Sequence, residues 1–218
     1  MTGIYKIKLA DLDARMLQEL QNQYAHAEVE LRVNTQEHWT EEEEDWFWNT
    51  IDRLDWKQEG NEDAVIRPVV NYLASQPFRN ILLFADILSE KLYTLDAQVF
   101  AENMGEHSFR EGYYFSVDDF LYARCCVVAN GRIAYQNVLD DPEEMPDNQT
   151  FGALLRVAPE AYHQKTGQRL QYQPAYDVET FSNEKGWMGT EEEHIKAYEK
   201  KHGHRPPGNP KRRVKRNK

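Results

Sequence analysis

The sequence predicts an α+β protein that is predominantly α-helical. Apolar residues recur at helical spacing through most of the 218 residues, and strict apolar-polar alternation is confined to the N-terminal region. Hydrophobic residues make up 40% of the chain, enough for a sizeable core. No apolar run approaches the roughly 18 residues of a membrane span, and the N-terminus mixes charges where a signal peptide is apolar. We therefore expect a cytoplasmic protein that has no contact with a membrane.

Residues 1–36 are predicted to form a small strand-helix-strand unit. Apolar and charged residues alternate at 5–9 and again at 27–33, and the residues between them show helical spacing. Because two strands alone are marginal in water, a further strand must complete the sheet. A later strand at 170–172, a second copy of the chain and the edge of a partner's sheet are the alternatives.

Residues 37–187 are predicted to form a helical core domain. Thr40 and Glu43 have the spacing of a capping box, which opens a helix with an apolar stripe. Asp96 is a candidate N-cap for a later helix. Pro159 is expected to separate the last two helices of this domain. Further helical patterns lie at 63–74, 77–92, 96–104, 116–129, 133–139, 151–158 and 160–165.

The pattern at 116–129 is predicted to be the buried central helix around which the others pack. Ser116 can cap its start, apolar residues follow on almost every side, and Asn130 and Gly131 can end it. Its Arg124 stays protonated at any ordinary pH, so it needs an acidic partner if it is buried.

Three acids are candidate partners of Arg124, namely Asp52, Asp86 and Asp96. Such a group either forms a structural ion pair or makes a polar site for anion binding or catalysis. The sequence leaves both alternatives open.

Two groups of aromatic residues are candidates for binding a partner protein. Trp46 and Trp48 flank the apolar stripe of the first core helix on opposite sides, so only part of this cluster can face one core. Tyr176 and Trp187 belong to an aromatic-containing stretch, 172–187, which is either a long ordered loop or an exposed arm. Core packing is the alternative for each group.

Residues 188–218 are predicted to form a charged helix followed by a disordered basic tail. Residues 203–218 carry seven basic residues and no acid, whereas residues 1–202 carry 37 acidic and 19 basic residues, a net charge of −18. Because residues 1–202 carry this net negative charge, they repel the phosphate backbone of a nucleic acid. A nucleic acid could therefore bind only through the tail. The anion-binding candidates in the tail are Lys211, Arg212, Arg213, Lys215 and Arg216.

No recognisable cofactor or metal motif occurs in the sequence, and we predict neither a cofactor nor a metal. Among the seven histidines, only His202 and His204 approach a metal-binding spacing, and they lie beside the tail. The adjacent Cys125 and Cys126 are expected to be small buried hydrophobic residues.

Four segments together resemble a bacterial family of unknown function, domain of unknown function 4240 (DUF4240). They are FWNTIDRL at 47–54, FSVDDFLYARCCVVANGR at 115–132, PEAYHQKTG at 159–167 and ETFSNEKGW at 179–187. The resemblance covers roughly residues 41–187 and implies a soluble, mostly helical protein. It carries over no functional residues.

Three functions remain as hypotheses. The first is a non-enzymatic interaction module, such as an immunity or regulatory protein, whose acidic body binds a basic protein. The second is an enzyme with a polar site around Arg124 and neighbouring acids. The third is binding of the basic tail to nucleic acid or another anionic surface.

Overall fold

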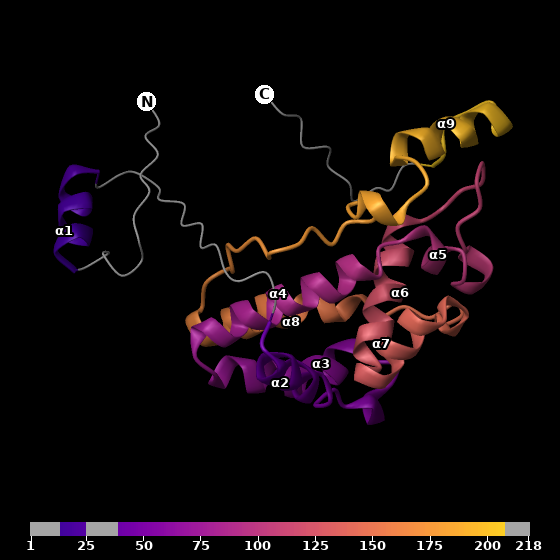
Figure 1. Cartoon of the computed structure of the whole chain (residues 1–218). Coiled ribbons are helices and arrows are strands. Elements are labelled where there is room, and N and C mark those ends of the chain that lie inside the picture. The colour runs from indigo at the N-terminus through magenta and orange to yellow at the C-terminus, as the bar shows by residue number, and fades with distance from the viewer. Residues whose placement is uncertain (1–13, 25–38, 208–218) are drawn as a thin grey trace. The chain divides into compact units, whose positions relative to one another are not determined.

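The computed structural model describes residues 14–24 and 39–207 (Figure 1). The chain divides into two compact units, Met1–His38 and Trp39–Lys218. In the first unit, the described element is helix α1 (Ala14–Gln23). The α-helices of the second unit are α2 (Glu41–Ile51), α3 (Glu62–Ser75), α4 (Phe78–Thr94), α5 (Gln98–Ala101), α6 (Val117–Ala129), α7 (Gly131–Asp140), α8 (Val157–Thr166) and α9 (Glu191–His202).

Short 3-10 helices join several of these α-helices. They are η2 (Trp56–Gln58), η3 (Gly105–His107), η4 (Pro142–Glu144), η5 (Gly152–Arg156) and η6 (Glu184–Gly186). Of the helices that the structure describes, none combines the length and the apolar character that a bilayer-spanning helix needs.

The predicted α+β class is wrong, because the described residues contain helices and no strand. The helix of the expected strand-helix-strand unit is present as α1, but the two alternating segments at 5–9 and 27–33 lie outside the described residues. Residues 170–172, one alternative for a third strand, are not paired as a strand. The mostly helical character of the protein is confirmed.

Local capping signals predicted several helix ends correctly. The Thr40 hydroxyl accepts a hydrogen bond from the backbone N–H of Glu43, whose side chain returns to Thr40, as in a capping box. Ser116 caps the start of α6 in the same way through Asp119 N–H. Gly167 ends α8 in the left-handed conformation, φ 72°, which glycine adopts without steric cost.

Two other local predictions were wrong. The helix expected from Asp96 to residue 104 is only the single turn α5, and its N-cap is Ala97, which provides no side-chain cap. Pro159 does not divide two helices but lies in the first turn of α8, where a missing N–H breaks no helical hydrogen bond. The pattern at 151–158 is mainly η5, which leads directly into α8.

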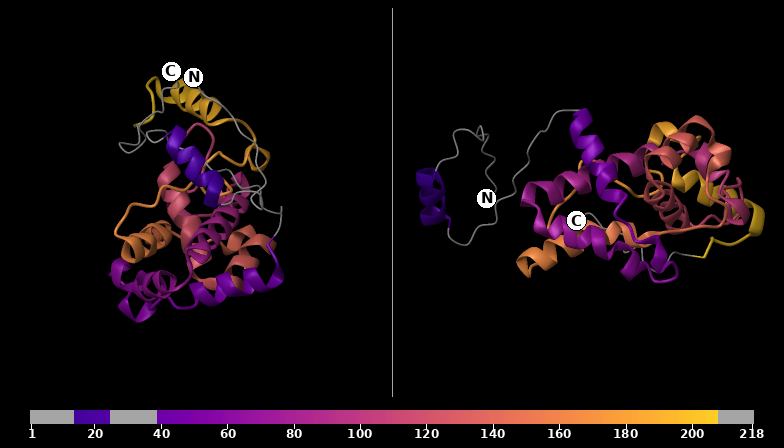
Figure 2. Two further views of the ribbon diagram at one scale, coloured as in Figure 1. Left: turned by 90° about the vertical axis from the view of Figure 1, so that its left-hand side faces the viewer. Right: turned by 90° about the horizontal axis from the view of Figure 1, so that it is seen from below.

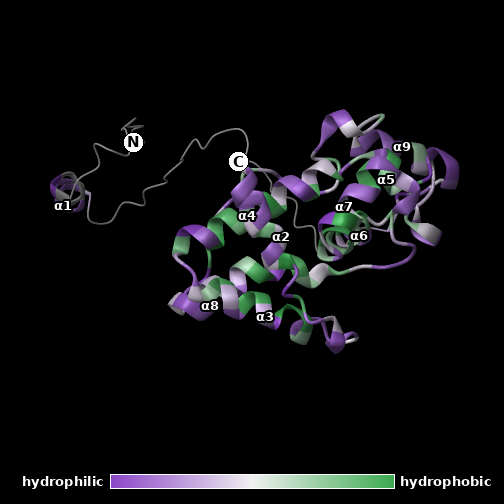
Figure 3. Cartoon of the chain, turned by 60° about the horizontal axis from the view of Figure 1, so that its bottom comes forward, coloured by the Kyte–Doolittle hydropathy of each residue, from purple (hydrophilic) through white to green (hydrophobic). Residues whose placement is uncertain are grey.

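The core forms where α4 contacts α2, α3, α6 and α8, while α3 also packs along α8 (Figure 2). Hydrophobic residues are concentrated on α3, α4 and α6 (Figure 3). Helix α6 is buried on almost every side, with nine of its thirteen residues inaccessible or nearly so. A helix of this kind can exist only inside a core.

Between α8 and α9, residues 168–190 form a long segment that we call the arm. Apart from η6 it contains no regular helix or strand, and it passes along α4 before reaching α9 (Figure 1). Since most backbone groups of α4 are used within the helix, the arm is held mainly through side chains.

Burial within this core predicts the effect of truncating two isoleucines. Ile66 on α3 is fully buried, whereas Ile133 on α7 is 78% exposed. We expect Ile66→Ala to lower the free energy of unfolding by about 2–5 kcal/mol, because it leaves a cavity. Ile133→Ala should change it by less than about 0.5 kcal/mol. Urea titration followed by circular dichroism measures both, and equal losses would contradict the packing described.

Candidate functional site

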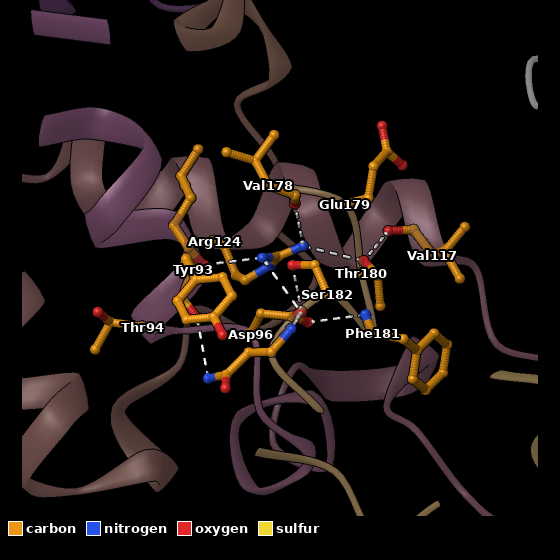
Figure 4. A network of polar contacts seen from close by, with 12 residues as sticks. Tyr93, Thr94, Asp96, Val117, Arg124, Val178, Glu179, Thr180, Phe181 and Ser182 are labelled. Atoms are coloured by element: carbon orange, nitrogen blue, oxygen red, sulfur yellow. Dashed lines mark hydrogen bonds and ion pairs between the residues drawn. The ribbon is translucent and has the colours of Figure 1, made fainter. Parts of the chain in front are cut away.

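The guanidinium group of Arg124 lies at the meeting point of α4, α6 and the arm (Figure 4). It is completely buried. Nη1 donates to the carbonyl oxygen of Leu92 at 2.8 Å, and Nη2 donates to Val178 O and Thr180 Oγ1, each at 3.0 Å. The group also lies over the ring of Phe120, 4.8 Å from its centroid.

Asp96 supplies the negative charge of this group and is also completely buried. Its carboxylate lies 3.9 Å from Nη1 of Arg124. It accepts hydrogen bonds from the backbone N–H groups of Phe181 (3.2 Å) and Asn183 (3.0 Å) and from the indole N–H of Trp187 (3.1 Å). The Ser182 hydroxyl is also within hydrogen-bond distance. One carboxylate thus fixes several consecutive residues of the arm.

The electrostatics of this pair are those of a structural ion pair. Burial lowers the pKa of Arg124, and the nearby charge of Asp96 acts in the opposite direction. A guanidinium group starts from a pKa so high that it remains protonated at neutral pH. A buried charge is tolerated when a partner and several hydrogen bonds replace its water, and both are present here. With no exposed surface on either side chain, the pair has no face on which a substrate could bind.

The other two predicted partners of Arg124 lie elsewhere. Asp52 caps the C-terminus of α2 and is exposed. Asp86, on α4, is buried and accepts hydrogen bonds from the hydroxyl of Tyr172 (2.6 Å) and the N–H of Ala175 (2.9 Å). Burial raises the pKa of Asp86, and these two hydrogen bonds oppose the rise. Asp86 therefore holds an earlier part of the arm.

The predicted aromatic candidates lie mostly inside the molecule. Trp48 and Trp187 are 4% and 7% exposed. Trp46 is half-buried and donates from its indole N–H to the hydroxyl of Tyr72, and Tyr176 packs against the ring of Tyr93. Trp48 and Trp187 are thus core residues and cannot serve as exposed anchors for a partner. The tail candidates at 211–216 lie outside the described residues.

A second charged group joins α2 and α4 and was not predicted from the sequence. Lys91 is buried, and its Nζ lies 2.7 Å from Glu44 and 3.5 Å from Glu90. Burial alone would raise the pKa of Glu44, but the hydrogen bond and charge of Lys91 lower it overall. Trp39 donates to Glu90 at 2.7 Å. In the sequence, Lys91 is a charged residue beside the apolar stripe of α4. That position does not predict that α2 packs over its side chain and buries it.

The titratable groups around α6 show no sign of reactivity. Cys125 and Cys126 are free thiols, and burial raises the pKa of Cys125 to about 12. A thiol with so high a pKa is a poor nucleophile at neutral pH. Across residues 14–24 and 39–207, no group of three or more His, Cys, Asp or Glu side chains is arranged to hold a metal ion.

Seven carboxylates gather around the end of α7, and we call this group the acidic face. Two hydrogen bonds of Asn148 hold the loop after η4 beside η3. The side-chain oxygen of Asn148 accepts a hydrogen bond from the backbone N–H of Glu106 at 2.9 Å, and the backbone N–H of Asn148 donates to the carbonyl oxygen of Met104. The members are Glu102, Glu106, Asp140, Asp141, Glu143, Glu144 and Asp147. None of them forms an ion pair within the described part of the chain.

An open cavity lies at the first turn of α4. It has a volume of about 440 Å³ and is lined by Phe78, Tyr162 and residues 168–172 of the arm. A shallower hollow of about 540 Å³ lies over η2 and the first turns of α3. Arg124 and Asp96 line neither of them.

His194 anchors α9 against an aromatic cluster. Its ring stacks on Phe181 and meets the edge of Phe109, with centroids 5.4 and 4.8 Å away. The Nε2 atom is buried and has no hydrogen-bond partner among the described residues. Burial lowers the pKa of His194, although Glu111 and Glu193 oppose the change.

The second unit is thus a helical protein whose buried charges bind the arm and whose unpaired charges lie on its surface. A family model described as "Protein of unknown function (DUF4240)" matches residues 43–164, more than half of the chain, and the chain belongs to this family. The match includes Arg124, Asp86 and Asp96 and ends before the arm. No curated protein and no solved structure matches the chain.

The burial of Arg124 predicts a large cost for removing its charge. We expect Arg124→Met to lower the free energy of unfolding by about 3–5 kcal/mol, because it leaves Asp96 buried without its cation. Arg132→Met is the matched control, since Arg132 pairs with Asp45 on the surface and should cost less than about 1 kcal/mol. Chemical denaturation compares the two, and an unchanged midpoint for Arg124→Met would refute the assignment.

The environment of His194 predicts a pH-dependent stability. Because its pKa is lowered in the folded state, its contribution is present at neutral pH and is lost as the pH falls below about 6.5 toward the lowered value. We expect the melting temperature of the wild type to fall more between pH 7.5 and 5.5 than that of His194→Phe. Parallel declines in the two proteins would show that other groups cause the loss.

Proposed function

We propose that this chain is a non-enzymatic interaction module that binds a basic partner protein through the acidic face. The observation that carries the proposal is the set of seven carboxylates around α5, η3, α7 and η4, which form no ion pair with any residue that the structure describes. The described residues of the second unit, 39–207, contain 31 acidic and 16 basic residues, a net charge of −15. The field of such a surface attracts cations and repels nucleic acid.

The surroundings of the acidic face suit a protein better than a small cation. Ile133 is 78% exposed, and its helical position, seven residues before Asp140, places it on the same side of α7. Val99 on α5 is 47% exposed. Acidic residues around a few exposed aliphatic side chains combine electrostatic steering with some apolar contact, which are the two usual elements of a protein interface.

The alternative of an enzyme around Arg124 has less support, because the side chain is fully buried and both of its terminal nitrogens, Nη1 and Nη2, donate to protein oxygens, although the buried Nε has no hydrogen-bond partner among the described residues. Binding of an anionic surface by the basic tail is a separate proposal that depends on residues 203–218, most of which lie outside the described part. It concerns a different partner and does not conflict with the first.

Charge reversal on the acidic face tests the proposed function. The full chain is immobilised and exposed to lysate of its native cells at about 0.15 M salt, where the Debye length is about 8 Å. We expect the wild type to retain a stoichiometric basic protein, and Glu143→Lys with Glu144→Lys to retain at least tenfold less. Binding to the wild type should also weaken as the salt concentration rises.

The control is Glu42→Lys with Glu59→Lys, which makes the same change in net charge at two exposed residues that do not belong to the acidic face. This variant should retain the partner nearly as well as the wild type. Recovery of no basic protein, or equal loss in both double variants, would contradict the proposal.

A further inference from the structure

The beginning of the arm leaves its backbone hydrogen-bonding groups unused. Within the described part of the chain, no hydrogen bond involves the backbone N–H or C=O of residues 169–173. Further along the arm, the N–H of Ala175 donates to the carboxylate of Asp86, and the N–H of Tyr176 donates to the hydroxyl of Ser89. The carbonyl oxygen of Val178 accepts a hydrogen bond from Arg124. Residues 169–173 are thus five consecutive residues whose backbone groups all lack a partner among the described residues.

Most side chains in this run are exposed, Tyr172 included at 38%, and Leu170 alone of the five is partly buried. Leu170 packs against the core, and Tyr172 points its hydroxyl toward Asp86 on α4. Arg169, Gln171 and Gln173 are exposed. A run of free backbone N–H and C=O groups on an exposed segment is the feature by which an edge strand pairs with another extended chain.

The 440 Å³ cavity opens beside this edge. Phe78 at the start of α4 is 48% exposed, and its ring lies 5.6 Å from that of Tyr162 on α8. Arg169 also lines the cavity and forms no ion pair or hydrogen bond with any described residue. The cavity therefore offers two aromatic rings and one uncompensated positive charge.

We infer that residues 169–173, with Phe78, Tyr162 and Arg169, form a docking site for an extended segment of a partner protein. The segment adds to the arm as a β-strand, and its backbone groups pair with those of residues 169–173. A large apolar or aromatic side chain of the segment enters the cavity, and an acidic residue beside it meets Arg169.

A polypeptide fits this site better than a small molecule does. Alternating donors and acceptors repeat along the edge at about 3.3 Å per residue, and another polypeptide backbone has the same repeat. The preference for an acidic residue distinguishes this site from the acidic face, which favours basic partners. The site lies at the first turn of α4, whereas the acidic face lies beyond its last turn, about 25 Å away along the helix axis.

Selection from a displayed library of random twelve-residue peptides on the immobilised full chain tests the inference. We expect enriched peptides to share an aromatic or large aliphatic residue with Asp or Glu nearby. Gln171→Pro removes one N–H donor from an exposed position, and it should weaken binding of the enriched peptides at least tenfold. Arg169→Glu should weaken acidic peptides and spare their Lys-substituted versions.

The controls separate backbone pairing from other forms of binding. Gln173→Ala alters an exposed side chain but keeps its N–H, so it should bind like the wild type. Enriched peptides that are N-methylated at alternate residues should not bind, because they cannot pair with the edge. Failure to enrich any peptide, or equal binding to Gln171→Pro, would overturn the inference.

Two further outcomes would assign the edge to a different occupant and also overturn the inference. One is a concentration-dependent dimer in sedimentation that Gln171→Pro abolishes, which indicates a second copy. The other is slow hydrogen exchange at residues 169–173 in the free chain, which indicates pairing within this chain. We expect fast exchange in the free chain and protection when peptide is bound.

Because the acidic-face variant Glu143→Lys with Glu144→Lys leaves this edge unchanged, it should bind the enriched peptides normally. This site and the proposed function can therefore fail independently.

Discussion

The buried carboxylate of Asp96 is the contact on which the arrangement of the second unit depends. It lies just after α4, faces Arg124 of α6, and accepts the hydrogen bonds of the arm at Phe181, Asn183 and Trp187. A buried carboxylate needs hydrogen-bond donors in place of water, and Arg124 without Asp96 would lose its buried ion-pair partner. The pair and the arm are therefore stable only together.

Two acids of the α4 region fix the direction of the arm. Asp86 binds residues 172 and 175, and Asp96, ten residues later, binds residues 181–187. The arm therefore runs in the same direction as α4. Most backbone groups of α4 are used within the helix, so the backbone of the arm pairs mainly with side chains and with neighbouring groups of the arm itself. Within the described residues no such partner reaches the backbone of residues 169–173, and a run of free backbone groups is the result.

Helix positions were largely predictable because their signals are local. Capping residues and apolar spacing placed α2, α3, α4, α6, α8 and α9 to within a few residues. The wrong prediction at Asp96 shows the limit of this approach. An Asp before a short apolar run favours an N-cap, but the side chain is used by residues some 90 positions later in the chain. No local pattern carries that information.

The candidate sites were less predictable for the same reason. A lone arginine in an apolar helix indicated that a counterion was needed, and the sequence narrowed the choice to three acids without selecting Asp96. The acidic face could not be recognised as one surface in the sequence, since tertiary contacts, namely the hydrogen bonds of Asn148 and the contact of α5 with η4, bring Glu102 and Glu106 beside residues 140–147. Trp48 and Trp187 were ambiguous because aromatic residues suit cores and interfaces equally well.

The extent of the family match and the extent of the folded core differ for a physical reason. The match ends at residue 164, yet the partners of the buried charges lie between 172 and 187. Without those residues, Asp86, Asp96 and Arg124 would all be exposed to water or left buried without their hydrogen bonds, and either state costs free energy. The stable helical unit therefore includes the arm at least as far as Trp187, and its boundary is set by buried charge as much as by apolar packing.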